Sequence, residues 1–176
     1  SSGVLKAYSA EENVDVYQGT GFFTGEKVVQ VQLNDGTLSD ELTADTILIA
    51  SGARTRIPDN IKGLENLDYI TSETFFGEQF PQQPYKSLVI LGGGPIAAEF
   101  AHIFAHLGTK VTVVQHNPRL LPIFDSDITE VVLKEYEKTG IAVYLNSEMI
   151  QVEEKDGVKK FTIEHRATGE INIIEA

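Results

Sequence analysis

The residues with the clearest capacity for chemistry form a glycine-rich turn between an apolar run and a stretch of helical periodicity. The members of this turn are Gly92, Gly93, Gly94, Pro95, Ile96 and Ala97. In the spacing G-x-G-x-x-A, the first glycine permits a tight turn, the second lets a pyrophosphate approach the backbone, and the small third residue lets a helix pack against a strand. Free N–H groups and positive potential at the start of a helix favour phosphate. The pattern therefore predicts a dinucleotide-binding turn; the alternative is a tight strand–helix connection without a ligand.

A second set of candidates lies where such domains recognise the adenosine ribose, about 20 residues after the glycines. Gln115 stands 21 positions after Gly94. An acid at this position would bond the ribose hydroxyls and repel a 2′-phosphate, whereas a glutamine forms the hydrogen bonds without the repulsion. His116 and Arg119 follow closely and are candidates to bind a phosphate, although a solvated surface charge is an equal alternative for Arg119. The choice between NAD and NADP stays open, with a slight preference for NADP.

The segments around the turn predict an α/β fold: a Rossmann-like parallel sheet with helices on both faces, followed by an antiparallel β-meander. Short apolar runs of the kind buried in parallel sheets are followed by longer runs that end in turn dipeptides. The expected strands of the sheet are residues 88–91, 110–114 and 141–145, and those of the meander are residues 149–155, 158–166 and 170–175. The expected turns of the meander are Asp156-Gly157 and Thr168-Gly169.

Two helices are expected between the strands of the sheet. The first occupies residues 95–107, begins with a proline that suits a first helical turn, and has Gly108 as its C-cap. Its expected apolar stripe consists of Ile96, Phe100, Ile103, Phe104 and Leu107. The second helix is expected to have Ser126 or Asp127 as its N-cap, with Glu130 able to close a capping box, and to run to Lys138 and stop at Gly140.

The first part of the chain predicts a partial β-meander that belongs to a second dinucleotide-binding domain. Its expected strands are residues 14–23, 27–33 and 37–45, with a hairpin turn at Asn34-Asp35-Gly36. The apolar run of residues 46–50, closed by Ser51 and Gly52, is typical of a strand buried on both faces. The expected domains are residues 1–57, a connector at 58–86, and residues 87–176, which lack a final strand.

Composition limits the class of partner. The formal net charge of −12 disfavours nucleic acid and anionic membrane surfaces, because both would repel the chain. The chain has no cysteine, which excludes a disulfide framework, a thiolate nucleophile and a cysteine zinc site within these residues. No apolar run approaches the roughly 18 residues that span a bilayer, so we expect a cytoplasmic protein. The first residue is not methionine, so a fragment or a processed chain is expected.

A metal site is weighed and set aside. Glu99, His102 and His106 share one face of the first expected helix, but a zinc site needs three or four converging ligands with outer support. The polar flank of an amphipathic helix explains them better, and we expect no metal. Asp125 and Asp127 are explained by helix capping rather than by paired acid–base catalysis.

Several stretches together resemble the pyridine nucleotide–disulfide oxidoreductases, the family of lipoamide dehydrogenase, glutathione reductase and mercuric reductase. They are SLVILGGGPIAAEF at residues 87–100, GTKVTVVQHNPRLLPIFD at 108–125, TADTILIASGARTRIP at 43–58 and GLENLDYITSE at 63–73. The resemblance covers nearly the whole chain. It implies two related dinucleotide folds, FAD first and NAD(P) second, with this chain beginning late in the first and ending inside the second. The redox-active cysteine pair would then lie outside these residues.

The resemblance also implies roles for individual residues. Glu99 corresponds to a helix glutamate near the nicotinamide, where its lysine partner is not present in this chain. The residues that would line FAD are Thr20 and Gly21 beside the adenine and Ser51 and Gly52 beside the flavin, and Met149 would flank the adenine of NAD(P). Two departures matter. Pro95 replaces an aromatic that shields the flavin in many relatives, and Gln115 replaces the acid of NAD-specific members.

The function implied is transfer of a hydride from NAD(P)H through FAD to a small-molecule or protein-bound disulfide, or to a similar acceptor. No catalytic residue is expected in this chain, which alone would be inactive, and the parent would be a homodimer formed through a domain outside it. Two alternatives stay open: a non-catalytic module that senses dinucleotides, and a flavin reductase with a non-disulfide acceptor such as oxygen or a ferredoxin. The unpaired strand at residues 46–50 predicts either pairing with a second copy or poor order in residues 1–57.

Overall fold

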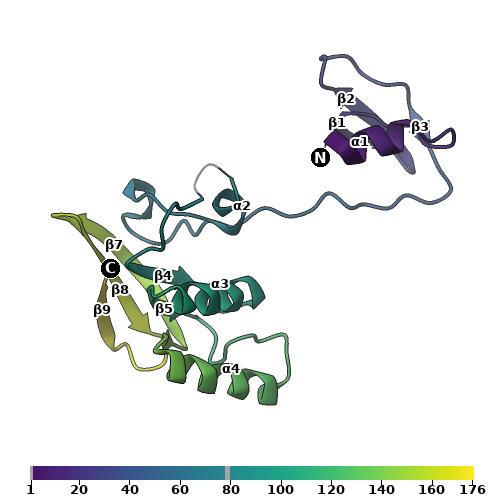
Figure 1. The fold of residues 1–176 in the computed structure, drawn as a ribbon. Coiled ribbons are helices and arrows are strands. Elements are labelled where there is room, and N and C mark those ends of the chain that lie inside the picture. Colours follow the sequence, from purple (N-terminus) through teal and green to yellow (C-terminus); the bar gives the residue numbers. More distant parts are fainter. Residues whose placement is uncertain (1, 78–79) are drawn as a thin grey trace. The chain divides into compact units, whose positions relative to one another are not determined.

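The computed structural model describes residues 2–77 and 80–176, and the chain forms two compact units, Ser1–Ala53 and Arg54–Ala176 (Figure 1). The first unit contains a short helix and a three-stranded antiparallel sheet in the order β1-β2-β3. Its elements are α1 (Ser2–Ser9), β1 (Gly19–Gly25), β2 (Val28–Leu33) and β3 (Leu42–Thr43). The expected turn after β2 is confirmed, since Leu33 N–H donates to the Thr37 carbonyl and Gly36 N–H donates to the Leu33 carbonyl.

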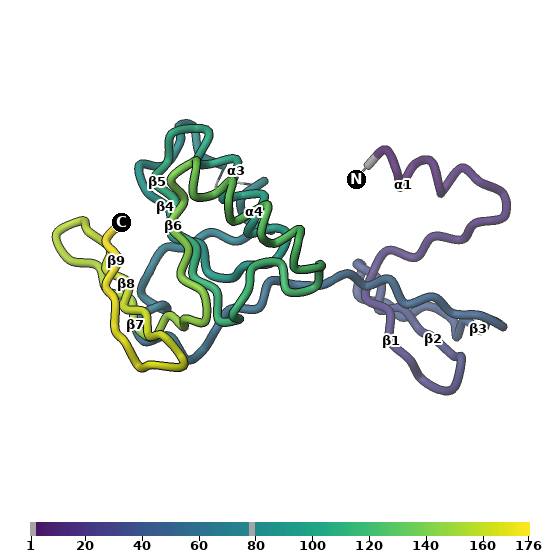
Figure 2. Tube along the Cα trace, turned by 90° about the horizontal axis from the view of Figure 1, so that it is seen from below, coloured from purple at the N-terminus to yellow at the C-terminus, as the bar shows by residue number. Residues whose placement is uncertain are grey.

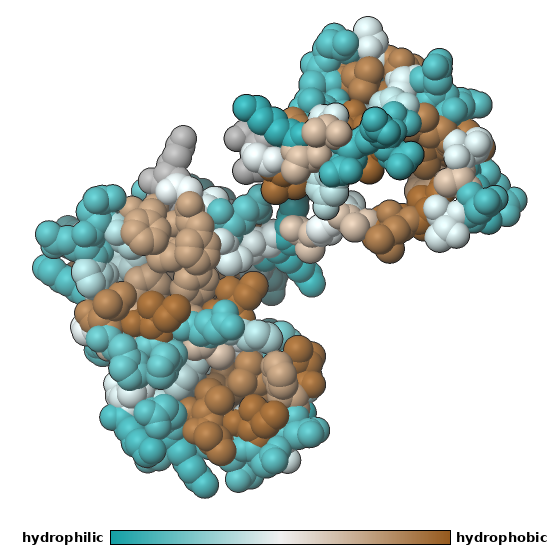
Figure 3. Space-filling model, turned by 45° about the vertical axis from the view of Figure 1, so that its right-hand side comes forward, coloured by the Kyte–Doolittle hydropathy of each residue, from teal (hydrophilic) through white to brown (hydrophobic). Residues whose placement is uncertain are grey.

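Three expectations for the first unit are wrong. Residues 14–18 precede the strand that begins at Gly19, and the third strand is reduced to two residues and a single bridge to Leu38. Residues 46–50, expected as a buried strand, are not in a strand, and Leu48 and Ile49 are 87% and 69% exposed. A central strand needs partners on both sides, and the described residues supply none for this run. Its apolar side chains are therefore exposed, and apolar side chains lie on the surface at several places in the view of Figure 3. The helix α1 is not anticipated by the sequence.

The second unit is built on a three-stranded parallel sheet in the order β4-β5-β6. Its strands and long helices are β4 (Ser87–Leu91), α3 (Pro95–His106), β5 (Lys110–Val114), α4 (Ser126–Thr139) and β6 (Ala142–Tyr144). Before them come a 3-10 turn, η1 (Leu64–Asn66), and a four-residue helix, α2 (Ser72–Phe75). After them comes an antiparallel sheet in the order β7-β8-β9, formed by β7 (Ser147–Lys155), β8 (Val158–His165) and β9 (Ile171–Glu175). The expected α/β class with a Rossmann-like sheet and a meander is confirmed.

The covering of the parallel sheet differs from the expected helices on both faces. Val111 and Val113 of β5 pack with α3 and α4 in one hydrophobic cluster, whereas Val114 packs with the meander in a second cluster. Because successive side chains of a strand point to opposite faces, α3 and α4 lie on one face and the meander covers the other (Figure 2). The carboxyl ends of β4, β5 and β6 thus lie at one edge between the two layers.

The buried face of α3 is narrower than its apolar pattern suggests. Ala101 and Phe104 are buried, but Ile96, Ile103 and Leu107 are each at least half exposed. The expected stripe of five residues is therefore wrong for these three. Ala98, Ala101 and Ala105 pack in the cluster that contains Val111 and Val113 of β5, so small side chains form much of the buried face of α3. Leu107, not the expected Gly108, is the C-cap of α3, and Gly108 follows it with φ 87°.

The caps of α4 also differ from the sequence pattern. The N-cap is Asp125, which makes no side-chain cap hydrogen bond, so the expected capping box with Glu130 is wrong. The C-cap is Gly140, with the left-handed φ of 75° that favours glycine. The turns at Asp156-Gly157 and Thr168-Gly169 are confirmed. No helix in residues 2–77 or 80–176 has the length and apolar composition required to cross a membrane.

Candidate functional site

The glycine turn joins β4 to α3 at the carboxyl edge of the parallel sheet. Gly92 N–H donates to the Val114 carbonyl at 2.8 Å, which extends the pairing of β4 and β5 by one residue. Its φ of 109° is a conformation that L side chains rarely adopt. The Gly93 carbonyl accepts from Leu121 N–H at 2.7 Å. The turn is therefore fixed on one side by the neighbouring strand and on the other by the loop that follows it.

The three glycines meet different surroundings. A Cβ atom on Gly93 would lie 2.7 Å from Leu120 Cδ2 and 3.0 Å from Gln115 Cγ, so a side chain at this position would force these two residues to move. A Cβ atom on Gly94 would meet no atom within 4 Å. The backbone at Gly94, the N-cap of α3, therefore faces open space, as the close approach of a pyrophosphate requires.

The start of α3 supplies the donors for an anion. Its first intrahelical hydrogen bond runs from Ala98 N–H to the Gly94 carbonyl at 3.0 Å, so Ile96 and Ala97 N–H have no acceptor within the helix. Pro95 at the first helical position has no N–H to leave unpaired. The first turn of α3 holds no acidic residue that would compete for these amides. The residues of the turn thus fit a diphosphate.

Gln115 follows β5 beside the glycine turn and is only 2% exposed. Its backbone N–H donates to the Tyr144 carbonyl, its carbonyl accepts from Ser147 N–H, and its Nε2 donates to the Arg119 carbonyl at 3.4 Å. The Oε1 atom is buried without a hydrogen-bond partner among the described residues. The side chain therefore lies within the loop, with an unused acceptor close to Gly93.

The two cationic candidates of this loop are placed differently. The His116 side chain is exposed, and its carbonyl accepts from Arg166 Nη1 at 3.2 Å. Arg119 is partly buried, and its Nη2 donates to the Pro122 carbonyl at 2.9 Å. Arg166 lies 50 positions beyond His116, and no sequence signal connects the two.

The other candidates of the second unit lie on α3 and in the meander. Glu99 is exposed on the second turn of α3. Met149 is 6% exposed and packs with Val152 and Ile163 in the core between the sheet and the meander, so its side chain does not reach the surface. The rings of His102 and His106 are adjacent, with centroids 4.2 Å apart and planes tilted by 42°. Across the described part of the chain, no group of three or more metal-ligating side chains forms.

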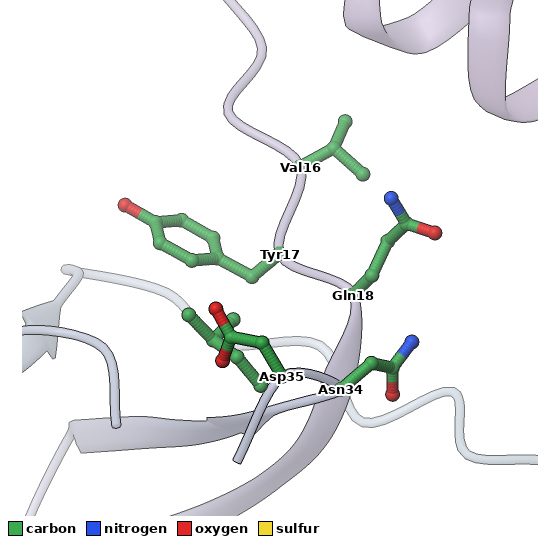
Figure 4. A pocket seen from close by; sticks show the side chains of 6 residues that line it. Val16, Tyr17, Gln18, Asn34 and Asp35 are labelled. Atoms are coloured by element: carbon green, nitrogen blue, oxygen red, sulfur yellow. The ribbon is translucent and has the colours of Figure 1, made fainter. Parts of the chain in front are cut away.

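The candidates for FAD lie in the first unit. Thr20 and Gly21 lie in β1, Ser51 and Gly52 lie after the apolar run, and all four are exposed. The same unit has an open hollow of about 410 Å³ lined by residues 16–18 and 33–35, and the Tyr17 side chain points to the opposite side of its backbone from Val16 and Gln18 (Figure 4). The residues that line this hollow include none of the four candidates.

Tyr136 fastens α4 to the start of α3, because its hydroxyl donates to the Ala98 carbonyl at 2.7 Å. Burial raises the pKa of this phenol to about 12. The folded state thus favours the neutral phenol, so the contribution to stability is complete below pH 10 and is lost as the pH rises from about 10 to about 12.

We expect Tyr136→Phe to lower the free energy of unfolding by about 1 kcal/mol at pH 8 and to lose less stability than the unmodified chain between pH 9.5 and 11.5. Urea unfolding followed by far-UV circular dichroism measures both; parallel pH profiles would contradict the assignment.

Comparison with known proteins gives consistent results. The family model described as "Pyridine nucleotide-disulphide oxidoreductase" matches residues 2–175. Mercuric reductase of Bacillus cereus is 33% identical over 162 residues, which are 92% of this chain and 24% of that protein. Dihydrolipoyl dehydrogenase of Chlorobaculum parvum is 35% identical over 139 residues, which are 77% of this chain and 28% of that protein. The chain therefore spans about a quarter of the length of these curated relatives.

A solved structure also matches the fold of this chain. The HOCl-induced flavoprotein disulfide reductase RclA from Escherichia coli matches with a TM-score of 0.74 and 25% sequence identity. The match covers 99% of this chain and 37% of that protein. The arrangement of elements described above is therefore shared with part of a flavoprotein disulfide reductase.

Proposed function

Because the chain belongs to the pyridine nucleotide-disulphide oxidoreductase family, we propose that its glycine turn binds the diphosphate of NAD(P) within an FAD-dependent oxidoreductase. The observation that carries this proposal is the open backbone at Gly94, next to helix amides without an internal acceptor. The free amides complement a diphosphate, and the absence of acid in the first turn of α3 removes a competitor.

The residues of this chain bind and orient the dinucleotide. Ile96 and Ala97 N–H donate to the diphosphate, and the hydrogen bonds of Gly92 and Gly93 hold the turn in place beforehand. Gln115 Oε1 has no partner but is buried within the loop, so we assign Gln115 to shaping the ribose edge rather than to a direct hydrogen bond with a ribose hydroxyl. In the whole enzyme, the chemistry supplied by the two cofactors is transfer of a hydride from NAD(P)H through FAD to a disulfide or similar acceptor.

The domain assignment follows from the same proposal. Residues 87–176 form the NAD(P)-binding part, residues 58–86 connect it to the rest, and residues 1–57 contribute to the FAD site. We assign Thr20, Gly21, Ser51 and Gly52 to FAD, and Glu99 to the surroundings of the nicotinamide. We further propose a cytoplasmic, homodimeric parent enzyme whose dimer contacts and redox-active thiols are formed by residues other than these.

Isothermal titration calorimetry of the purified chain with NADH and with NADPH tests the function. We expect at least one of the two to bind with a Kd below about 1 mM. Because the chain has no cysteine, we expect no reduction of a disulfide substrate by the chain alone. Heats indistinguishable from dilution for both nucleotides at millimolar concentration would refute the proposed site.

A further inference from the structure

Arg166 lies at the same edge as the ribose loop, although it belongs to the turn that follows β8. Its backbone N–H donates to the Asn146 carbonyl at 2.8 Å. Its guanidinium Nη1 donates to the His116 carbonyl at 3.2 Å, and its Nε lies 3.0 Å from Glu148 Oε1. The residue therefore joins the end of β8, the start of β7 and the loop after β5 at a single point.

This point is next to the position where a dinucleotide domain recognises the adenosine ribose. His116 directly follows Gln115, and two backbone hydrogen bonds, Ser147 N–H to the Gln115 carbonyl and Asn146 N–H to the Asn117 carbonyl, bring the β6–β7 connection against the loop. No acid occupies position 115 to repel a phosphate. The guanidinium of Arg166 therefore brings a positive charge to the ribose edge of the proposed site.

We propose that Arg166 recognises the 2′-phosphate of NADP(H) and thereby sets the preference for that nucleotide over NAD(H); this inference rests on the proposed function. A phosphate monoester carries a charge of about −1.5 to −2 at pH 7, and a guanidinium forms paired hydrogen bonds with it. The hydrogen bond to His116 and the contact with Glu148 use two of the five N–H donors of the guanidinium. The remaining donors are available to the phosphate.

For Arg166 to bind the phosphate, its ion pair with Glu148 must break. The side chains of Arg166 and Glu148 are 48% and 45% exposed, and an ion pair with that degree of exposure contributes little to stability. Exchange of the carboxylate for a more highly charged phosphate is therefore favourable. Arg119, whose Nη2 donates to the Pro122 carbonyl, is the other guanidinium of this loop and is the competing candidate for the same phosphate.

Two variants test the inference in opposite directions. Arg166→Gln removes the cation, and we expect NADPH to bind at least about tenfold more weakly while NADH binding changes by less than about twofold. Glu148→Gln removes the competing carboxylate, and we expect NADPH to bind several-fold more tightly with NADH again unchanged. Calorimetric titration with the two nucleotides separately gives both ratios, and circular dichroism melting checks that each variant folds.

Lys160→Gln is the matched control. Lys160 also lies on β8, and its Nζ is 3.0 Å from Glu175 Oε1, but it is five residues from His165, or about 17 Å along the strand. This variant should leave the ratio of the Kd values for NADPH and NADH unchanged.

The inference is overturned, while the proposed function stands, if Arg166→Gln weakens the binding of both nucleotides equally or changes the binding of neither. If Arg166→Gln does not fold, an unchanged ratio in Glu148→Gln overturns it. Failure of the unmodified chain to bind either nucleotide refutes the proposed function itself, and this inference with it.

Discussion

Replacement of Gly94 by aspartate is expected to abolish dinucleotide binding without loss of the fold. Gly94 has φ −81° and ψ −177°, extended values that any residue adopts, and an added Cβ atom meets nothing within 4 Å. Aspartate is also a favourable N-cap, so its carboxylate would accept the N–H of Ile96 or Ala97 and place a negative charge where the diphosphate binds. The loss of two charge-assisted hydrogen bonds, roughly 1.5–3 kcal/mol each, predicts at least a hundredfold rise in Kd.

The melting temperature separates this effect from damage to the structure. Because aspartate caps a helix slightly better than glycine, Gly94→Asp should melt at the same temperature as the unmodified chain or a little above it. Gly94→Ala is the control for bulk without charge, and it should weaken binding by much less than Gly94→Asp. Binding by Gly94→Asp within about threefold of the unmodified chain would show that the diphosphate does not lie against Gly94.

The parts of the site that the sequence predicts are those whose residues are close together in the chain. The glycine turn, β4 and β5 are short, carry strong local patterns, and occur where the pattern places them. The buried strand expected at residues 46–50 fails for the opposite reason, because an apolar run becomes a strand only when other strands pair with it. The same reasoning applies to α3. The spacing of its apolar residues predicts a helix, but which of these side chains are buried depends on how the helix packs against the sheet.

The residues that the sequence does not predict depend on contacts distant in the chain. Arg166 reaches the His116 carbonyl only because β7 and β8 fold back beside the loop after β5. Gln115 is correctly located after β5, yet its side chain lies inside the loop, held by the Arg119 carbonyl. A position in a motif thus predicts where a backbone passes, whereas the direction of a side chain depends on the packing around it.

Gly63→Ala is expected to be the most destabilising alanine substitution at a glycine of the second unit. Gly63 has φ 87°, and an added Cβ atom would lie 2.1 Å from the Val152 carbonyl oxygen. That carbonyl belongs to β7, which Lys62 joins through hydrogen bonds to the backbone of Ile150 and Val152, so neither segment can yield without breaking them. Left-handed strain of about 1–2 kcal/mol and the loss of two hydrogen bonds, about 0.5–1.5 kcal/mol each, predict a loss of roughly 2–5 kcal/mol in the free energy of unfolding.

Gly169→Ala provides the comparison that isolates the steric term. Gly169 has φ 70°, but its nearest contact would be Glu164 Oε1 at 3.9 Å, so alanine there meets backbone strain without a clash. We expect this variant to lose only about 1–2 kcal/mol in urea unfolding followed by far-UV circular dichroism. The difference between the two variants then measures how strongly the segment at residues 61–63 is held against β7. Equal losses would mean that this segment moves away from β7 at little cost, and that the connector does not secure the meander beneath the parallel sheet.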